Sequence, residues 1–592
     1  MPLYQKLVED LQEVDVIIAG GGTAACIVAS RLAAADPDLS ILLIEGGKNN
    51  YNEANVVNPA LYLEHLAPGS KTAIFYKGKK SEALAGRELI IPSGGILALN
   101  AVTFDSWKSP GWSADEMLPF MKKLETYHGA GDAKYHGYDG PVHISDGGHR
   151  SFKSESDFIT AASKVGYPEI KDLQNLDSNN GFERWMRTVS KDGKHQDTAH
   201  KYLHPLLQDG NHPNLHVLVE SKVVRVIFDD YKRATGVEYT PNSDFQAEIG
   251  LTSHPKSIIK ARKLVVVSCG ACGTPSVLER SGVGNPEILK EASVPLVADV
   301  PGVGHNYQDH NLIFFPYRTA LDTDETNDAF LSGRYPREAF LAEKPPILRW
   351  NSVDVSSKIR PTDCEVAALG KEFQAAWYRD FKNQPNRPLM LMALVSSYLG
   401  DQSSIPPGYI HIVGPEVTDA PVFDTGFFSD AHDIDLKKQI WAYKKQRELM
   451  RRTEMYRGEL EIGHPKFPAG SKAACVDLTS KAYIPGSEIR DIEYFAEDDI
   501  AIEQFLRENI STTWHSLGTA KMAPPDQMGV VDLDLSVYGV QGLKLVDLSI
   551  APENVGANTN NTAMAIGEKG ADIIAKELGL IKGGFGKSIL PN

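Results

Sequence analysis

The first fifty residues alternate short apolar runs with a glycine-rich turn. Residues 14–19 form a strand-sized run rich in valine and isoleucine, and Gly20, Gly21 and Gly22 follow it directly. Residues 24–35 space alanine and leucine as a helix does, and residues 41–44 form a second apolar run. This pattern predicts a strand, a tight turn, a helix and a second strand.

Strand-like runs return in the middle of the chain, at residues 215–219, 223–228 and 264–267. The acidic segment 229–232 interrupts them, which predicts a small antiparallel element that leads back into a parallel sheet.

Residues 317–490 are irregular and rich in proline and aromatic side chains, with one helix-like stretch at 436–453. We assign this region to a substrate domain. Beyond it the pattern predicts a helix at 498–509, a strand at 543–546 and a final helix at 563–578.

The composition limits the possible partners and compartments. The 592 residues carry a formal net charge of −16, which disfavours nucleic-acid binding because phosphate recognition needs a positive surface. Five cysteines are too few for a disulfide framework in a chain of this length. We find no secretory signal, no membrane-spanning run and no peroxisomal C-terminal signal. We therefore expect an intracellular, cytoplasmic protein with no membrane partner.

Gly20 to Ala25 form the G-x-G-x-x-A version of the dinucleotide fingerprint, between a predicted strand and a predicted helix. Gly20 permits the tight turn, Gly22 lets the backbone approach a pyrophosphate, and the small Ala25 lets the helix pack on the strand. Glu45 lies at the end of the second strand. A carboxylate there accepts hydrogen bonds from ribose hydroxyls and repels a 2′-phosphate. A glycine-rich turn alone could be a structural bend, but this context favours FAD or NAD over NADP.

Four motifs resemble those of one family, in the family's order. They are the fingerprint itself, V-V-V-S-C-G-A-C-G-T-P at 265–275 with S-G-V-G at 281–284, P-G-V-G-H-N-Y-Q-D-H at 301–310, and T-W-H-S-L-G-T at 513–519. The chain resembles the glucose–methanol–choline (GMC) oxidoreductases from about Val14 to Leu580. Segments such as L-I-E-G-G at 43–47 and N-V-G-A-N-T at 554–559 resemble its alcohol (methanol) oxidase branch.

The resemblance implies an α/β fold, α+β overall, in which a Rossmann-like FAD-binding domain is interleaved with a substrate-binding domain built on an antiparallel sheet. Residues 13–313 would mainly bind FAD, residues 314–500 would mainly bind substrate, and residues 501–580 would return to the FAD domain with the catalytic pair.

The resemblance also implies that His515 and Asn558 face the flavin N5 across the substrate carbon. A histidine near neutral pKa can take the hydroxyl proton, and an amide can hold the substrate oxygen without adding a competing acid or base. The cofactor-binding residues that it implies are Gly20, Gly22, Thr23, Ala24, Glu45, Asn100, Val223, Asp547, Asn558 and Thr559.

We do not expect a metal site. Cys269 and Cys272 have C-x-x-C spacing, but no second cysteine pair completes a site. His195, His200 and His204 have usable spacings, but they fall in a stretch that resembles the family's flavin-domain sequence.

One loop departs from the family pattern. Asn100 follows Gly94 and Gly95 at the family's spacing, yet Asp105 and Trp107 come almost directly after it, so most of the flavin-proximal loop is missing. Unpaired polar groups there would cost about 1–3 kcal/mol each, which predicts weak cofactor retention. Residues 92 and 93 are proline and serine where some members carry a histidine for covalent attachment, so we expect non-covalent FAD.

The leading functional hypothesis is an oxidase of short primary alcohols that reacts with O2 and gives aldehyde and hydrogen peroxide. A formate oxidase is the sister possibility, but formate oxidases carry an arginine where this chain has Asn558, and a neutral side chain favours a neutral substrate. A flavin-binding protein that has lost catalysis and a dehydrogenase with another electron acceptor stay open. The resemblance further implies a homo-oligomer.

Overall fold

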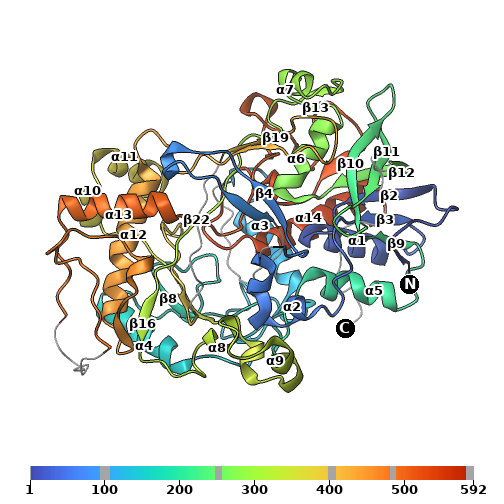
Figure 1. Ribbon diagram of the computed structural model, residues 1–592. Coiled ribbons are helices and arrows are strands. Elements are labelled where there is room, and N and C mark those ends of the chain that lie inside the picture. Colours follow the sequence, from blue (N-terminus) through green and yellow to red (C-terminus); the bar gives the residue numbers. More distant parts are fainter. Residues whose placement is uncertain are drawn as a thin grey trace.

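The computed structural model describes residues 2–67, 69–93, 107–246, 256–397, 408–479 and 489–581 (Figure 1). Its largest sheet has the order β1 (Leu3–Tyr4), β9 (Leu215–Leu218), β3 (Ile41–Ile44), β2 (Glu13–Ala19), β12 (Ser257–Val267), β11 (Ala234–Pro241) and β10 (Ser221–Phe228), and β23 (Leu543–Leu545) also pairs with β12. Neighbours from β1 to β12 are parallel, as are β12 and β23, whereas β11 and β10 are antiparallel.

β12 belongs to both halves of this sheet. Its first residues pair with β11 and alternate between exposed and buried side chains, as a strand with one solvated face does. Its last residues, Val265, Val266 and Val267, are fully buried and pair with β2 and β23. The antiparallel hairpin thus leads into a buried parallel sheet, as the sequence pattern predicts.

A layer of helices packs around one buried carboxylate. α1 (Thr23–Ala35) follows β2 and packs against α14 (Asn560–Glu577), which also contacts α3 (Ala114–Leu124). Glu568 on α14 accepts from Arg31 Nη2 at 2.6 Å, from Lys123 Nζ at 2.9 Å and from the Tyr202 hydroxyl at 2.8 Å. Removing one partner of such a buried pair costs about 3–5 kcal/mol, so this cluster fixes α1 and its N-terminus relative to the sheet.

A second region lies beside this sheet, on the left in Figure 1. It contains the antiparallel sheet β18 (Leu394–Val395), β17 (Val353–Lys358) and β8 (Gly181–Arg184), and the antiparallel pair β16 (Tyr317–Thr319) and β21 (Tyr456–Glu459). β8 precedes the β10–β11 hairpin in the chain, so the two regions interleave. The helices α4 (Phe152–Lys164) and α12 (Ile434–Arg451) pack together over an apolar cluster that includes Phe158, Phe182 and Trp441.

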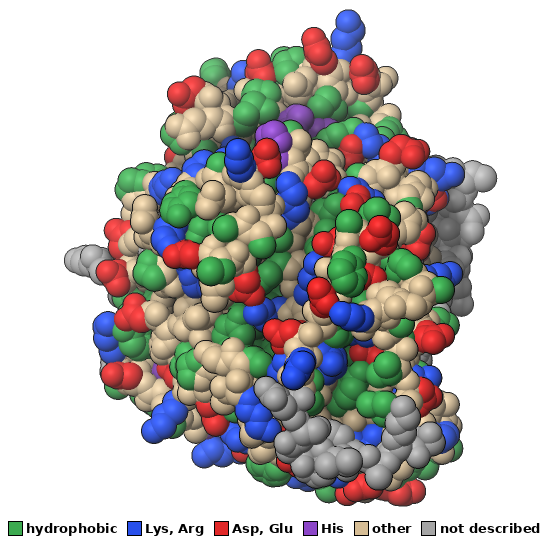
Figure 2. All heavy atoms as spheres, turned by 90° about the vertical axis from the view of Figure 1, so that its left-hand side faces the viewer, with side chains coloured by type: hydrophobic (Ala, Val, Ile, Leu, Met, Phe, Trp, Pro, Cys, Tyr) green, Lys and Arg blue, Asp and Glu red, His purple; other side chains and the backbone are tan. Residues whose placement is uncertain are grey.

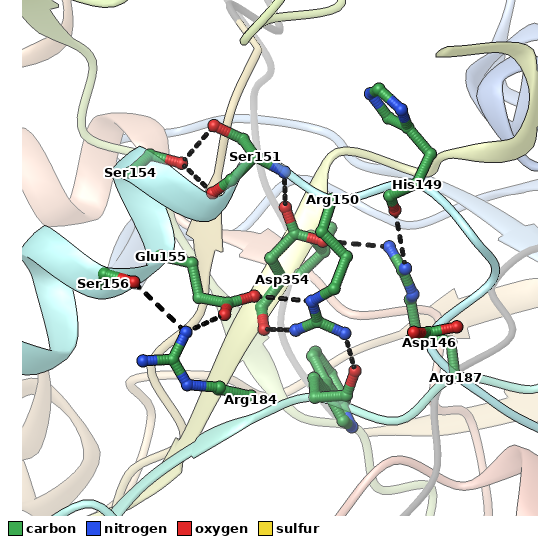
Figure 3. A network of polar contacts seen from close by, with 12 residues as sticks. Asp146, His149, Arg150, Ser151, Ser154, Glu155, Ser156, Arg184, Arg187 and Asp354 are labelled. Atoms are coloured by element: carbon green, nitrogen blue, oxygen red, sulfur yellow. Dashed lines mark hydrogen bonds and ion pairs between the residues drawn. The ribbon is translucent and has the colours of Figure 1, made fainter. Parts of the chain in front are cut away.

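A network of buried charges joins α4 to β17 (Figure 3). Arg150 Nε donates to Glu155 Oε2 at 2.5 Å, and its Nη2 donates to the Asp354 carbonyl at 2.6 Å. Arg187 Nη1 donates to Asp354 Oδ1 at 3.0 Å, and Arg184 pairs with the other Glu155 oxygen. Each buried carboxylate therefore meets an arginine, which is the arrangement that makes buried charge tolerable.

The outer helices of this region are α10 (Asp363–Ala368), α11 (Lys371–Asp380) and α13 (Ala496–Asn509). Figure 2 shows the face on this side of the molecule, where acidic and basic side chains are interspersed with apolar ones. The net negative charge of the chain is therefore not gathered into one acidic field on this face.

Shorter elements complete the described chain: α2 (Ala54–Val57), β4 (Ile74–Lys77), β5 (Ile90–Ser93), β6 (Glu125–Tyr127), β7 (Val142–Ile144), α5 (His204–Gln208), α6 (Gly270–Arg280), β13 (Val283–Gly284), α7 (Pro286–Glu291), β14 (Ala298–Asp299), β15 (Asn311–Leu312), α8 (Asp328–Leu331), α9 (Arg337–Glu343), β19 (Tyr409–His411), β20 (Val422–Asp424) and β22 (Ser511–Thr512).

The predicted fold class is confirmed: a Rossmann-like parallel sheet is interleaved with a region built on small antiparallel sheets. The division at residues 313 and 500 stays a prediction. None of the helices in the described ranges combines the length and apolar character that a membrane crossing requires.

Candidate active site

The predicted fingerprint forms a tight turn at the C-terminal end of β2. Gly20 has a φ of +97°, and a Cβ atom there would lie 2.3 Å from the Ser268 carbonyl oxygen, so only glycine fits. Gly22 is the N-cap of α1 and offers no side chain to the first turn, which contains no acidic residue. The N–H groups of Thr23 and Ala24, in the first turn, have no intrahelical acceptor, so they suit a phosphate, as a dinucleotide site requires.

Glu45 lies beside this turn, immediately after β3. Its Oε2 accepts from Gly21 N–H at 2.6 Å, and its Oε1 accepts from Gly47 N–H at 2.7 Å. β10 begins next to it, because Ser221 N–H donates to the Glu45 carbonyl at 2.9 Å. Val223, two residues further along β10, is thereby brought to the same end of the sheet.

Asp547 lies on the other side of the turn, two residues after the end of β23. Its buried carboxylate accepts from Gly270 N–H at 2.9 Å, from Thr274 Oγ1 at 2.6 Å and from Ser549 N–H at 2.7 Å. Burial raises the pKa of Asp547 although these donors favour its charged form. Ser268, which touches Gly20, donates its hydroxyl to the Val546 carbonyl at 2.6 Å. The predicted residues around the fingerprint thus form one contiguous site, and its glycines and uncapped helix fit FAD.

His515 is buried and pairs with a second histidine. Its Nδ1 lies 2.9 Å from Nδ1 of His310, and the two rings are nearly perpendicular. His310 Nε2–H donates to the Val555 carbonyl at 2.8 Å. Burial lowers the pKa of His310 to about 4, and burial together with the His310 neighbour lowers that of His515 well below its usual value. Both rings are therefore neutral near pH 7.

Asp309 binds the backbone of both histidines. Its carboxylate accepts from His310 N–H at 2.7 Å, from His515 N–H at 2.9 Å and from the hydroxyls of Tyr307 and Thr512. Burial raises its pKa to about 6 despite these donors. Trp514, the residue before His515, has a φ of +60°, a strained conformation for a bulky side chain. Four donors and a strained turn fix the direction in which His515 points.

The same segment also anchors the loop that carries Asn558. Asn554 Nδ2 donates to the Asp309 carbonyl at 3.0 Å, and Asn554 N–H donates to Gln308 Oε1 at 2.9 Å. Asn558 is 8% exposed, and Thr559 after it is the N-cap of α14. Through Val555 and Asn554, the segment 308–310 therefore links the two predicted catalytic residues.

Asp309 and His310 were not predicted as site residues, although both lie in a quoted motif. The polar Gln-Asp-His run in this motif was the signal that could have indicated them, because the rest of the motif forms tight turns. The predicted Asn100 and the shortened loop around it lie in residues 94–106, outside the described residues.

The alternative metal ligands have separate partners. His200 Nδ1 lies 2.6 Å from Asp197 Oδ2, His204 Nε2 lies 3.0 Å from Asn50 Oδ1, and His195 Nδ1 lies 3.0 Å from the Val56 carbonyl. Cys269 and Cys272 are free thiols, and burial raises both of their pKa values. Within the described ranges, no three His, Cys, Asp or Glu residues gather as metal ligands would.

Comparison with known proteins identifies the family of the chain. Sequence profiles described as GMC oxidoreductase match residues 14–312 and 404–567. The chain is 38% identical to an alcohol oxidase of Candida boidinii over 96% of both chains. It is 36% identical to an alcohol oxidase of Pichia angusta over 96% of this chain and 95% of that one.

Solved structures share the fold at lower identity. Formate oxidase from Aspergillus oryzae RIB40 superposes with a TM-score of 0.77 at 19% identity, covering 96% of this chain and 99% of that one. An FAD-dependent oxidoreductase from Chaetomium thermophilum gives 0.76 at 23% identity, covering 96% and 100%. The predicted family, and FAD as its cofactor, are thereby confirmed, and the non-covalent attachment stays a prediction. The chain is a member of the GMC oxidoreductase family.

Proposed function

We propose that the protein is an FAD-dependent oxidase of short primary alcohols, which converts an alcohol and O2 to an aldehyde and hydrogen peroxide. Its full-length similarity to two alcohol oxidases supports the reaction class. The observation that carries the mechanism is the hydrogen-bond chain from Val555 through His310 to His515.

This series of hydrogen bonds determines which ring nitrogen of His515 carries no hydrogen. The Val555 carbonyl can only accept, so His310 Nε2 carries the hydrogen of that neutral ring. His310 Nδ1 then has a lone pair, and the 2.9 Å contact requires the hydrogen on His515 Nδ1. Nε2 of His515 is therefore left with a lone pair, which is the state that a general base needs.

His515 Nε2 takes the hydroxyl proton of the bound alcohol in this proposal. The buried imidazole is neutral before the reaction, so the base is available across the physiological pH range. The imidazolium is stabilised as negative charge develops on the neighbouring alcohol oxygen. The Asn558 amide donates to that oxygen and holds the carbon in line for hydride loss.

The residues around the fingerprint would hold the cofactor. The α1 N-terminus at Gly22 would face the pyrophosphate, and Glu45 would meet the adenosine ribose. When bound, FAD supplies the hydride acceptor and the site of reaction with O2.

The proposal can be tested with purified, FAD-saturated protein under air. Methanol, ethanol, a longer primary alcohol and formate would each be supplied while O2 uptake, aldehyde and peroxide are measured. Equal amounts of aldehyde and peroxide from a short alcohol are expected. O2 uptake with formate alone would assign the protein to a different substrate class, and flavin binding without turnover would refute oxidase activity.

A further inference from the structure

A cavity lined by charged and polar residues lies outside the residues assigned to FAD and alcohol. It has a volume of about 510 Å³, within the range of roughly 300–1,000 Å³ that is typical of small-molecule sites. Its walls come from β7, from the segment after β6 and from the residues around a turn at 190–194; they are lined by His128, His143, Ser190, Lys191, Asp192, Lys194, Gln196 and Lys201.

The cavity has an excess of positive charge. Of the described residues, none forms an ion pair with Lys191, Lys194 or Lys201, although 40 such pairs occur elsewhere. Asp192 is the single carboxylate on the wall, and it accepts from the Ser190 hydroxyl. With neutral histidines the lining carries a net charge of +2, in a chain whose net charge is −16. Among the described residues, Asp192 therefore offsets only one of the three lysine charges on the wall.

The wall is held in place by a tight turn. Ser190 N–H donates to the Lys194 carbonyl at 2.8 Å, and Gly193 has a φ of +80°. A Cβ atom on Gly193 would lie 2.3 Å from the Arg349 side chain, so the turn packs closely on its neighbour. Lys194 Nζ is positioned by a 2.8 Å hydrogen bond to Asn58 Oδ1. The lysines of this turn are therefore presented by a defined backbone.

Gln196 adds an unsatisfied buried acceptor to the wall. The residue is 2% exposed, and its Nε2 donates to the carbonyls of Lys194 and His195. Its Oε1 is buried and accepts no hydrogen bond from the described residues. Buried acceptors usually have a partner, so this one is an exception next to the cavity.

The positive charge of the cavity also affects the two histidines on its wall. His128 Nε2 and His143 Nδ1 lie 2.9 Å apart, so the two rings share one hydrogen. Burial and Lys191 lower the pKa of His128, while burial, Lys201 and His128 lower that of His143. Burial also lowers the pKa of Lys201 and Lys194. A bound anion would relieve each of these unfavourable interactions.

We propose that this cavity binds a phosphate dianion, as the free ion or as a small phosphomonoester. Two negative charges match the net +2 of the lining. Ammonium groups bind phosphate as point charges, and the remaining volume is larger than one phosphate needs.

The binding can be measured by titration calorimetry on FAD-saturated protein, with inorganic phosphate and glycerol 3-phosphate as probes. Sodium chloride would keep the ionic strength constant. We expect saturable binding that Lys201→Met and Lys191→Met each weaken by about 5- to 10-fold, from the loss of one charge-assisted contact. Lys191 is exposed, so this variant should fold even if the half-buried Lys201→Met does not. Lys466→Met, at an exposed lysine elsewhere, is the matched control and should bind as the wild type does.

Tighter binding of glycerol 3-phosphate than of phosphate would identify the ester as the ligand class, and the reverse would identify the free ion. Heats no larger than those of added chloride would overturn the proposal. It would also fail if phosphate bound only FAD-free protein and FAD displaced it, because the cavity would then belong to the flavin site.

Discussion

Two buried histidines in this protein differ in charge, one neutral and one protonated, although both are almost fully enclosed. His515 meets the neutral ring of His310, and burial lowers its pKa. His136 lies between two carboxylates, 2.9 Å from Glu125 Oε1 and 3.1 Å from Asp172 Oδ2. Burial disfavours its charge too, but the two carboxylates outweigh it and raise the pKa of His136 to about 9. The partners, not the burial, decide the charge.

The difference separates a chemical role from a structural one. His136 uses both ring nitrogens in ion pairs and stacks on Tyr127 at 3.7 Å, so no lone pair is left for chemistry. His515 is hydrogen-bonded through Nδ1, and no described residue hydrogen-bonds to its Nε2. The ion pairs of His136 therefore suit a structural role, whereas His515 suits the proposed role of base.

The largest effect is expected from His515→Gln. Glutamine keeps a polar side chain of similar size but cannot take a proton, so kcat/KM for alcohol should fall by about 10²- to 10⁴-fold. FAD content and thermal stability should stay near the wild-type values. Steady-state oxygen uptake measures the loss, and a decrease of less than fivefold would show that another group is the base.

His136→Gln should produce the opposite pattern. It leaves Glu125 and Asp172 buried without their cation, which costs about 3–5 kcal/mol in the free energy of unfolding. Urea unfolding measures this cost. Turnover per folded molecule should be unchanged, and a variant that is stable but inactive would reverse the roles assigned to the two histidines.

The pH dependence of stability should also have opposite signs for the two regions. His136 has a raised pKa, so its contribution is complete below 6.5 and is lost as the pH rises through about 9. His310 has a lowered pKa, so its contribution is complete above 6.5 and is lost as the pH falls towards 4. Each change is about 3 kcal/mol.

Unfolding curves between pH 5 and 9 for the wild type, His136→Gln and His310→Leu would separate the two contributions. The first variant should lose stability less steeply than the wild type on the alkaline side, and the second less steeply on the acid side. Parallel curves for all three proteins would mean that neither histidine has the assigned charge.

The smallest effect is expected from His310→Leu on the reaction itself. Without its acceptor, the N–H of His515 Nδ1 is unpaired, and the other tautomer becomes competitive at a cost of about 1–3 kcal/mol. The rate constant for flavin reduction should fall by about 10- to 100-fold, and added imidazole should restore part of it. His305→Leu, in the same segment, is the matched control. An effect on KM alone would show that His310 does not position the base.

The local part of the fold could be predicted from sequence because its signals are local. The predicted strand at 41–44 matches β3 at both ends, and the predicted helix at 24–35 differs from α1 by one residue. The predicted strand at 264–267 covers only the end of β12. The first half of β12 carries Lys260 and Arg262 and pairs with a strand that the apolar pattern does not reveal.

The site could be predicted only in part. Glu45 and Asp547 lie near the fingerprint turn because each follows a recognisable strand, and their role in binding FAD stays a prediction. His310 was missed because its role depends on contacts with His515 and Val555, more than 200 residues away. Spacing along the chain does not encode such contacts.

Anaerobic reduction of the flavin tests the central claim most directly. Methanol or ethanol would be mixed with FAD-saturated protein without oxygen while the visible absorption of the oxidised flavin is followed. We predict bleaching by the short alcohol, recovery on admission of air, and little bleaching in His515→Gln. Bleaching by formate alone, or by no alcohol while FAD stays bound, would contradict the account.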